Sequence, residues 1–497
     1  MEEIKNNSQY KTVFKATALF GGVQVWQILI SIIRSKLVAI ILGPAGMGIT
    51  GLYTSSTDLI KSCTSFGLSA SAVKYIAEAN GEGDKRKLSR VVAIFGKLML
   101  LTGLLGMLAV IVFSPLLSKS AFGNYDYTVP FIVLSVTLLL FQLSAGKLSI
   151  LQGTRKLKSL AKASLIGSVI GLFTTIPLYY IWSTQGIVPA LVIAALTGYF
   201  LNWYYARKIK ISVVVVSFKE AFDEGRGMIN LGVAMTLSGI LATAVAYIIR
   251  VFVSNRGGTG EVGLYTAGMT ILTTYVGMIF SAMATDYFPR LSASCNDNNK
   301  SCELVNQQAE IALLILGPIL ALFIIFAPLV ITILYSDAFL PTVRYMQWAS
   351  VGMMFRAISW AISFLFLAKG DTKVFITNEV AANIITLVTS LLGYHLWGLD
   401  GLGVAFLASY VLYFLLVWFV CAKHYSFRFY SPLCKIMIIH VAITLTVFVL
   451  MFQNNLWLKY IPAALLAIIS ILFSFRELDK RIGVRVFISN LFNKKKQ

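Results

Sequence analysis

The sequence predicts an all-α integral membrane protein with about 14 transmembrane helices, arranged as two six-helix lobes followed by a C-terminal helix pair. Three observations lead to this fold class. The 497 residues are 58% hydrophobic and 13% charged, with a mean hydropathy of +0.79, which lies outside the range of soluble globular domains. Apolar runs of about 18 or more residues recur along almost the whole chain. Related sequence segments return roughly 215 residues later.

The apolar runs define about fourteen expected spans. In chain order they cover residues 13–41, 50–77, 91–113, 128–150, 161–182, 187–206, 228–253, 263–285, 307–334, 345–367, 374–396, 402–421, 434–452 and 457–474. A short segment before the first span of each half, Gln9–Lys15 and Phe218–Gly225, mixes aromatic residues and lysines at helical spacing. We expect both segments to lie in the membrane interface.

Internal similarity divides the chain into two halves. The matching segments are IIR at 32–34 and 248–250, GLY at 51–53 and 263–265, FSP at 113–115 and FAP at 326–328, GT at 153–154 and GD at 370–371, and QGIVPA at 185–190 and DGLGVA at 400–405. Six spans per half is an even number, which predicts parallel repeats related by an axis along the membrane normal.

The predicted organisation has four parts, which are an N-lobe at 1–210, a C-lobe at 211–425, an additional helix pair at 426–475 and a basic cytoplasmic tail at 476–497. The tail carries apolar residues among its cations. They are Ile482, Val486, Phe487 and Phe492. The tail either lies on the anionic inner leaflet or is a disordered extension, and the sequence leaves both open.

Two glycine clusters have the spacing that cradles a dinucleotide. Gly46, Gly48 and Gly51 form G-x-G-x-x-G, and residues 258–263 repeat the pattern. A dinucleotide site needs a preceding strand and a parallel sheet, and neither is predicted here. The clusters are therefore interpreted as turns between spans. The chain also lacks the G-x-x-x-x-G-K-[ST] phosphate loop, so no nucleotide cofactor is expected.

The net charge of +21 is read as a topology signal. About thirty basic residues fall on one set of alternate loops, against four on the other set. Those four are Lys119, Arg256, Arg344 and Lys459. The bias places both termini in the cytoplasm of a bacterial inner membrane, and its spread over many short loops speaks against nucleic acid binding.

The sequence offers no catalytic or metal constellation. The five cysteines are predicted to form no disulfide, and Cys295 and Cys302 lack zinc spacing. The three histidines are scattered, with no HExxH motif and no triad-like grouping. The chain is therefore predicted not to be an enzyme, to need no cofactor or metal, and to be a monomer.

Polar residues inside the second span of each half are the first candidate site. The two stripes at helical spacing are Thr54, Asp58, Lys61, Ser65, Ser69 and Ala72, and Thr266, Thr270, Thr273, Gly277, Ser281 and Ala284. They are interpreted as two walls of a water-filled chamber, with helix–helix packing through small residues as the alternative. Asp58 either neutralises Lys61 or holds a coupling ion.

Basic residues within the spans are the second candidate site. Arg34 and Arg250 are taken as equivalent positions of the two halves, with Lys36 nearby, and Arg356 lies midway along the tenth span. Arginine suits phosphate because its planar fork donates two parallel hydrogen bonds. The excess of cations indicates an anionic substrate, whereas snorkelling to the interface is the competing interpretation for the two arginines. For Lys97 and Lys147, near the ends of their spans, snorkelling is expected.

Several segments together resemble a known family. They are LGPAGMGITGLY at 42–53, AVKYIAE at 72–78, LSRVVA at 88–93, FGNYDY at 122–127 and LAKGDTKVFITNEV at 367–380. With them, residues 10–425 resemble the Wzx-type O-antigen and enterobacterial-common-antigen flippases of the multidrug/oligosaccharidyl-lipid/polysaccharide exporter superfamily. The resemblance implies a MATE-like bundle that transports undecaprenyl-pyrophosphate-linked oligosaccharides across the inner membrane.

In such flippases, basic residues of a central cavity are thought to bind the pyrophosphate. That role is assigned here to Arg34, Arg250, Lys61 and Arg356. A polysaccharide polymerase and a chain-length regulator are the partners that the resemblance suggests. Three alternatives stay open at this point: a multidrug/cation antiporter of the same fold, a flippase for the peptidoglycan lipid precursor, and a membrane enzyme.

Overall fold

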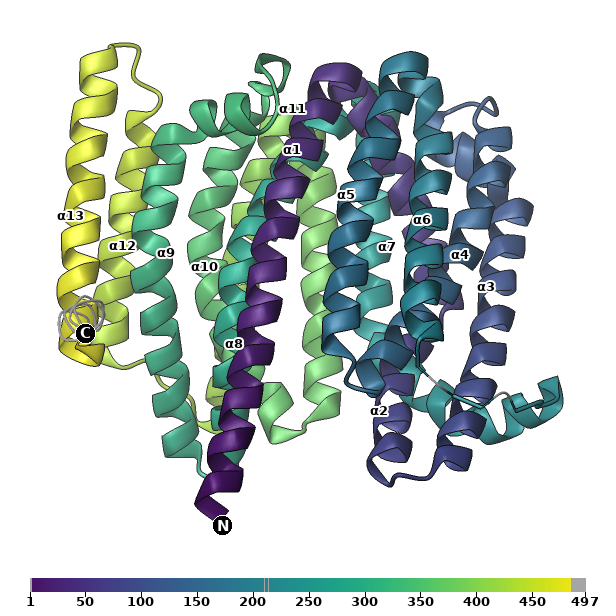
Figure 1. The fold of residues 1–497 in the computed structure, drawn as a ribbon. Helices are drawn as coiled ribbons and strands as arrows, with labels where there is room; N and C mark the ends of the chain where they lie inside the picture. The colour runs from purple at the N-terminus through teal and green to yellow at the C-terminus, as the bar shows by residue number, and fades with distance from the viewer. Residues whose placement is uncertain (1, 210, 213, 484–497) are drawn as a thin grey trace, which may run out of the picture. The chain divides into compact units, whose positions relative to one another are not determined.

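The computed structural model describes residues 2–209, 211–212 and 214–483, and these residues form helices joined by short connections, without a β-strand among them (Figure 1). The chain divides into two compact units. Unit 1 comprises Met1–Gly263 and Leu334–Ser336, and unit 2 comprises Leu264–Ile333 and Asp337–Gln497. The all-α membrane fold class predicted from the sequence is confirmed.

Unit 1 contains the first six helices and most of the seventh. They are α1 (Glu2–Thr64), α2 (Leu68–Gly81), α3 (Lys85–Phe122), α4 (Thr128–Gly153), α5 (Leu157–Trp182), α6 (Ile187–Arg207) and α7 (Phe218–Thr270). A 3-10 turn, η1 (Ser183–Gly186), joins α5 to α6. The segments predicted as interfacial, Gln9–Lys15 and Phe218–Gly225, are both helical and continue into α1 and α7 without a break.

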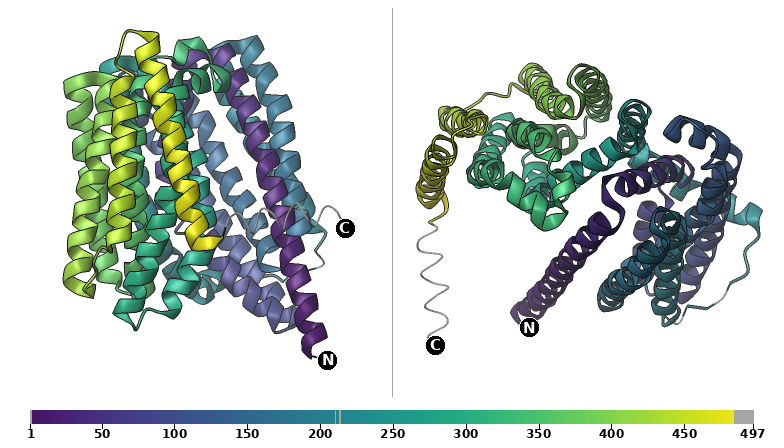
Figure 2. Two further views of the ribbon diagram at one scale, coloured as in Figure 1. Left: turned by 90° about the vertical axis from the view of Figure 1, so that its left-hand side faces the viewer. Right: turned by 90° about the horizontal axis from the view of Figure 1, so that it is seen from above.

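Unit 2 contains the remaining helices. They are α8 (Val276–Ala293), α9 (Asn298–Leu334), α10 (Thr342–Lys369), α11 (Thr372–Tyr425), α12 (Ser431–Leu450) and α13 (Leu456–Ile482). The last two run side by side and form a helix pair at the end of the chain (Figure 2). Of the apolar residues predicted in the basic tail, Val486, Phe487 and Phe492 lie outside the described residues, and Ile482 is the last residue of α13.

Ten of the described helical segments are long and apolar enough to cross a membrane. Four of these ten exceed the length of a single crossing and contain a bend or a 3-10 turn: 26–64, 157–207, 235–293 and 372–425. Counting each of the four as two crossings would give the fourteen spans predicted from the sequence. That exact number stays a prediction, whereas the multi-pass membrane character is established.

The bends of the chain recur at one fixed spacing. Gly43 (φ 62°, ψ −169°) and Gly258 (φ 75°, ψ 178°) bend α1 and α7, and they stand 215 residues apart. This region of φ/ψ space is open to glycine alone. Ser183 (φ 51°, ψ −130°) and Gly398 (φ 59°, ψ −138°) are a second pair at the same spacing. A common backbone geometry at a constant offset is what a duplicated unit produces.

The two glycine-rich turns meet within unit 1. A Cβ atom added at Gly48 would overlap the Thr259 carbonyl oxygen, and one added at Gly263 would overlap the Pro44 carbonyl oxygen. The contact is reciprocal, and it pairs Gly48 with Gly263 at an offset of 215. The GLY segments at 51–53 and 263–265, matched at an offset of 212, are therefore out of register by three residues.

The turns themselves differ from the sequence interpretation in one detail. The residue that reverses the chain direction in the first turn is Gly43, and Gly46, Gly48 and Gly51 are helical residues of α1. Gly48 is needed because its helix passes directly over another backbone, where no side chain has room. Gly258 does lie in the second glycine cluster, and it is the residue that bends α7.

The second span of the first half is interrupted. Helix α1 ends at Thr64, and the backbone takes positive φ at Phe66 (48°) and Gly67 (59°) before α2 begins. Gly67 lies against the backbone of Gly232 on α7, with no space for a Cβ on either. In the second half the corresponding helix continues through a π-helical turn, η2 (Ile271–Tyr275). Neither predicted polar stripe therefore follows one regular helix, because the break and the π turn change which residues share a face.

These contacts explain why unit 1 extends to Gly263 instead of ending near the predicted lobe boundary at 210/211. Most of α7 packs against the first half of the chain through glycines at both ends, Gly232 and Gly263. The spatial division and the sequence repeat are thus different divisions of the chain, and the predicted lobes stay a prediction about the repeat.

Aromatic and histidine contacts hold the cores of the two units. In unit 1, Tyr53 packs against Phe131 with ring centroids 5.2 Å apart. In unit 2, the buried His440 of α12 lies 3.2 Å from the Ser470 hydroxyl and 3.1 Å from the Ser474 hydroxyl of α13. Its ring sits directly on Gly317 of α9, where a Cβ would overlap it.

Candidate functional site

The clearest charged group inside a span is the pair Asp58 and Lys61 on α1, in unit 1. The Lys61 ammonium donates to the Asp58 carboxylate at 2.5 Å, and it also lies 5.5 Å from the centre of the Phe141 ring. The side chains of Lys61 and Asp58 are 40% and 50% exposed. A charged pair is costly inside a bilayer unless it faces water or a partner. The open side of this pair therefore marks a position where a polar ligand can be received.

Arg34 lies on the same helix, before the bend at Gly43. Its guanidinium interacts electrostatically with the Tyr179 hydroxyl on α5. Tyr179 is almost fully buried, in the core that also contains Leu42 and Tyr53. Arg34 itself is half-buried, as is Lys36. A phenol at one side of the guanidinium leaves other donors of the planar fork available for an anion.

Arg250 does not occupy the position equivalent to Arg34. Arg34 precedes the bend at Gly43 by nine residues, whereas Arg250 precedes the bend at Gly258 by eight. One residue rotates a side chain by about 100° around a helix. Arg250 donates from Nη1 to the carbonyl of Ala246 at 3.2 Å, so the observed contacts of the two arginines also differ. Matching the two IIR segments placed Arg250 one residue out of register.

The hydroxyl groups of the predicted stripes mostly bond to their own helices. Thr54 donates to the carbonyl of Thr50 at 2.9 Å, Thr270 to Thr266 at 2.8 Å and Thr273 to Met269 at 2.7 Å. Such bonds satisfy the hydroxyl hydrogen and leave the oxygen able to accept.

The ends of the first stripe lie at the helix break. Ser65 follows the last residue of α1, and its amide donates to the Lys61 carbonyl at 2.9 Å. Ser69 lies on α2, where its carbonyl accepts from the Ser149 hydroxyl of α4 at 2.9 Å. Both residues are half-buried. Of the first stripe, then, only Thr54, Asp58 and Lys61 belong to α1.

Arg356 of α10 is the candidate cation of unit 2. Its guanidinium carbon lies 5.6 Å from the ring centre of Phe280 and 5.4 Å from that of Tyr410. Cation–π contacts hold a charge in place without neutralising it. No ion pair to Arg356 occurs within the described part of the chain, so its charge stays available to a ligand.

The candidate residues are divided between the two units. Unit 1 holds Arg34, Lys36, Thr54, Asp58, Lys61, Ser65, Ser69 and Arg250, and unit 2 holds Thr266, Thr270, Thr273 and Arg356. Direct contact is observed within the pair Asp58 and Lys61.

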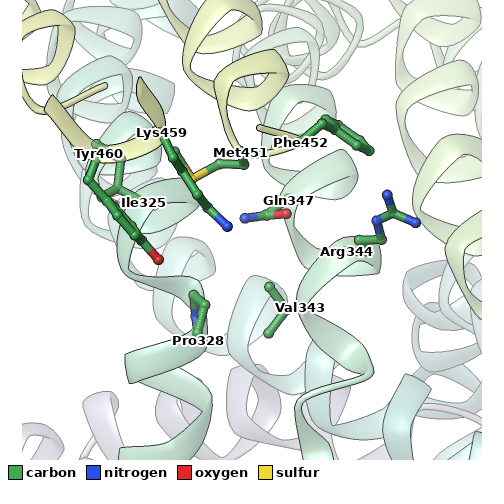
Figure 3. Close-up of a pocket in the computed structure, with 9 residues that line it drawn as sticks. All are labelled: Ile325, Pro328, Val343, Arg344, Gln347, Met451, Phe452, Lys459 and Tyr460. Carbon is green, nitrogen blue, oxygen red and sulfur yellow. The ribbon is translucent and has the colours of Figure 1, made fainter. Parts of the chain in front are cut away.

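A cavity in unit 2 holds basic residues that the sequence analysis did not select as site residues (Figure 3). It has a volume of about 180 Å³ and is lined by Ile325, Pro328, Val343, Arg344, Gln347, Met451, Phe452, Lys459 and Tyr460. Figure 3 shows the Lys459 ammonium directed toward the Gln347 amide. Arg344 stacks on Phe452 at 4.8 Å and lies 3.7 Å from the Asp400 carboxylate. Arg344 and Lys459 are two of the four basic residues on the loops that carry few cations, and their rarity there is the sequence feature that could have identified them.

No group of three or more histidine, cysteine, aspartate or glutamate side chains that could hold a metal ion occurs in the part of the chain that the structure describes. The observed candidate sites hold cations, hydroxyl groups and the Asp58 carboxylate, and cations and hydroxyl groups bind anions and sugars by charge and hydrogen bonding.

Comparison with protein families and curated proteins gives consistent relatives. A family model described as polysaccharide biosynthesis protein matches residues 37–344. The lipid III flippase of Escherichia coli (strain K12) is 24% identical over 393 residues, covering 76% of this chain and 91% of that protein. A putative O-antigen transporter of Shigella flexneri is 25% identical over 342 residues, covering 67% of this chain and 79% of that protein.

Solved structures share the fold. The lipid II flippase MurJ in an inward closed conformation matches with a TM-score of 0.66 at 14% identity, covering 94% of this chain and 99% of that one. An inward-facing multidrug resistance MATE family transporter of the MOP superfamily matches with a TM-score of 0.69 at 16% identity, covering 82% and 96%. These likenesses confirm the MATE-like fold expected from the sequence resemblance.

Proposed function

The chain belongs to the polysaccharide biosynthesis protein family, and on that basis we propose that it is a flippase for lipid-linked oligosaccharides. In full, it moves undecaprenyl-pyrophosphate-linked repeat units of O-antigen or a similar surface polysaccharide from the inner to the outer leaflet of the cytoplasmic membrane. Relatives named as a lipid III flippase and a putative O-antigen transporter align over most of their length and support this substrate class.

The observation that carries the proposal is the partly exposed charged pair of Asp58 and Lys61 on α1, a helix long and apolar enough to cross a membrane. A charge at mid-bilayer costs at least about 2.5–3.5 kcal/mol, so a chain retains it where water or a ligand compensates. A polyprenyl-pyrophosphate sugar is anionic at one end and hydrocarbon at the other. Cations in a polar chamber replace the water around its headgroup while the tail stays in lipid.

The proposed roles follow from the contacts. Lys61, Arg34, Arg250 and Arg356 bind the pyrophosphate. Lys36, Thr54, Ser65, Ser69, Thr266, Thr270 and Thr273 line the path of the headgroup. Asp58 competes with the substrate for Lys61, because a carboxylate 2.5 Å from the ammonium must give way before a phosphate takes its place. Asp58 is also the position proposed for ion coupling, because an ion bound to its carboxylate would compete with Lys61.

Alternating access supplies the translocation step. Parallel repeats that rock against each other expose a chamber first to one face and then to the other. The grip on the pyrophosphate has to be moderate, because tight binding prevents release on the far side. The chain acts as a monomer within the inner membrane, with both termini in the cytoplasm, and delivers its product to a polysaccharide polymerase and its chain-length regulator.

The test uses purified protein in liposomes that contain a defined polyprenyl-pyrophosphate saccharide. The wild-type chain should expose inner-leaflet substrate to a membrane-impermeant sugar-modifying reagent, and the Arg34→Ala/Arg250→Ala variant should not. Replacement of two exposed arginines outside the candidate site, Arg290 of α8 and Arg428, as Arg290→Ala/Arg428→Ala removes the same charge as a control and should leave the rate unchanged. Lysine at positions 34 and 250 should retain part of the rate, since charge remains but the bidentate fork is lost.

The alternatives have distinct outcomes in the same vesicles. Equal rates for the wild type and the Arg34→Ala/Arg250→Ala variant would remove these arginines from the mechanism. Failure of the wild type to move any polyprenyl-pyrophosphate saccharide, with efflux of cationic dyes in its place, would overturn the flippase proposal in favour of a multidrug antiporter. Movement of the peptidoglycan precursor alone would overturn the assignment to surface polysaccharide.

A further inference from the structure

A second cavity lies entirely within unit 1, apart from the candidate residues of α1. Its volume is about 640 Å³. Its walls come from α3, α4 and α6, where α4 packs against both neighbours, and from the segment that joins α6 to α7 (Figure 1). The lining residues are Ser89, Val92, Ala93, Gly96, Lys97, Leu100, Lys147, Ile150, Trp203, Ala206, Arg207, Ile209, Ile211, Ser212, Val214, Val215 and Val216.

Three cations from three different helices converge on this cavity. They are Lys97 of α3, Lys147 of α4 and Arg207 of α6. No carboxylate is present among the lining residues that the structure describes. Three positive charges around one cavity repel each other, so an anion between them lowers the electrostatic energy.

The observed contacts of these cations leave their charge uncompensated. The Lys97 ammonium lies 4.4 Å from the centre of the Phe218 ring, and the Arg207 guanidinium lies 5.3 Å from that of Trp203. Aromatic faces orient a cation but do not neutralise it. Lys147 is half-buried and makes no hydrogen bond or ion pair with any residue in the described part of the chain.

Three carboxylates lie at the start of α7, which follows the joining segment, and none of Glu220, Asp223 and Glu224 lines the cavity. Glu224 accepts from Arg90 at 2.5 and 2.8 Å, and this hydrogen-bonded ion pair holds the pKa of Glu224 below its usual range. Glu220 accepts from the Ser217 amide at 2.6 Å. Both glutamates therefore have partners outside the cavity, and an anion that fills the cavity would come from a ligand.

The remaining walls of the cavity are apolar. Val92, Leu100 and Ile150 line it together with the valines of the joining segment, and Val215 is 92% exposed. An exposed valine beside a basic, aromatic-rimmed cavity is typical of the membrane interface, where hydrocarbon and headgroups meet. A free phosphate ion would use the cations and leave this apolar surface uncovered, whereas a lipid uses both.

We propose that this cavity binds the phosphate diester headgroup of an anionic membrane phospholipid, whose hydrocarbon chains lie along the apolar wall formed by α3 and the joining segment. Lys97, Lys147 and Arg207 surround the phosphate, as basic pockets between spans do for other anionic lipids. The basic residues of this region place the site in the cytoplasmic leaflet. The inference is independent of the transport function proposed above, because the site shares no residue with the candidate residues of that function.

The experiment measures lipid retained by the full chain in native mass spectrometry after detergent exchange. Three probes are added in parallel at equal concentration: phosphatidylglycerol, phosphatidylcholine and inorganic phosphate. We expect the wild-type chain to retain one phosphatidylglycerol at least tenfold more often than phosphatidylcholine. The Lys97→Met/Lys147→Met variant should lose that preference, and Lys97→Arg/Lys147→Arg should keep it.

A matched control removes two lysines from exposed positions of unit 2, Lys300 and Lys423, as Lys300→Met/Lys423→Met. It should retain phosphatidylglycerol like the wild type. Equal retention in the Lys97→Met/Lys147→Met variant, or equal retention of phosphatidylcholine by the wild type, would overturn the proposal. Displacement of phosphatidylglycerol by an equal concentration of inorganic phosphate would show a simple anion site and overturn the lipid assignment.

The melting temperature of each variant without added lipid checks its fold. If Lys97→Met/Lys147→Met does not yield folded protein, the single variant Lys147→Met decides the question, since Lys147 has no protein partner to lose in the described part of the chain. The lipid preference of the wild type stands as a test that needs no variant.

Discussion

The second spans of the two halves start alike and then diverge. Each begins at a glycine bend, Gly43 or Gly258, with nearly the same backbone angles. In the first half, this span then carries the charged pair Asp58 and Lys61 and breaks at Phe66 and Gly67. In the second half, the span continues through the π turn of η2, and its candidate residues are threonines. The backbone bend is common to both copies, whereas the charged pair Asp58 and Lys61 belongs to the first copy.

This difference suits a transporter for a single anion. Under the proposed function, Lys61 of the first half would bind the pyrophosphate, and the candidate residues on the matching span of the second half offer hydroxyl groups instead of a cation. Hydroxyl groups hydrogen-bond sugars and phosphates without adding a strong electrostatic attraction. The shared backbone geometry fits the proposed rocking motion, and the difference in charge fits the proposed binding of one anion.

The largest effect is expected at the contact that the two halves share. Gly48→Ala and Gly263→Ala each place a Cβ on a backbone carbonyl oxygen, which a rotamer change cannot relieve. Overpacking of this kind costs roughly 1–3 kcal/mol and more where backbone must move. We expect both variants to lower the melting temperature by similar amounts, and Gly260→Ala, which has open space, to leave it nearly unchanged. A difference between the first two variants would break the symmetry argued here.

The next effect concerns the charge difference between the spans. Asp58→Asn removes the competitor for Lys61, so the phosphate is bound too tightly for release, and Lys61→Met removes the cation; each single change should reduce flipping about tenfold or more. The double replacement Thr270→Val/Thr273→Val removes hydroxyl groups of the second span and should reduce flipping by about twofold. The liposome assay measures both. Equal losses would show that the two walls contribute alike and would sink the asymmetric interpretation.

The last effect concerns Arg356, whose guanidinium contacts aromatic rings and, within the residues that the structure describes, no carboxylate. Arg356→Lys keeps the charge and loses planar stacking on Phe280 and Tyr410, a difference of about 0.5–1 kcal/mol. Flipping should fall about two- to fivefold in this variant and much further in Arg356→Met. The concentration of substrate needed for half-maximal rate should rise in step. An Arg356→Met protein with the wild-type rate would remove unit 2 from anion binding.

Much of the fold could be predicted because apolar length and glycine content are visible in the sequence. The membrane class, the helix pair at the end of the chain and the repeat spacing near 215 all depend on such patterns. The backbone angle of each glycine is not visible, so the reversal at Gly43 could not be distinguished from the helical Gly46, Gly48 and Gly51. Ser183 was still less accessible, because a non-glycine residue there adopts the conformation of Gly398.

The candidate site was less predictable for a related reason. Matching side-chain letters aligned Arg34 with Arg250, although their distances from the bends differ by one residue. Lys97, Lys147 and Arg207 are far apart in sequence, and their convergence depends on how α4 packs between α3 and α6. The contact of Lys61 with Asp58 was accessible because both lie within one helical turn.

The contact between His440 and Gly317 affects how this chain can be truncated. The His440 imidazole of α12 packs on Gly317 of α9, and it lies within hydrogen-bonding distance of the Ser470 and Ser474 hydroxyls of α13. A reporter fusion that ends after residue 425 would lack α12 and α13, so unit 2 would lose the packing of His440 on Gly317. Truncated chains of this kind are common tools for mapping topology, and here they would report on a damaged protein.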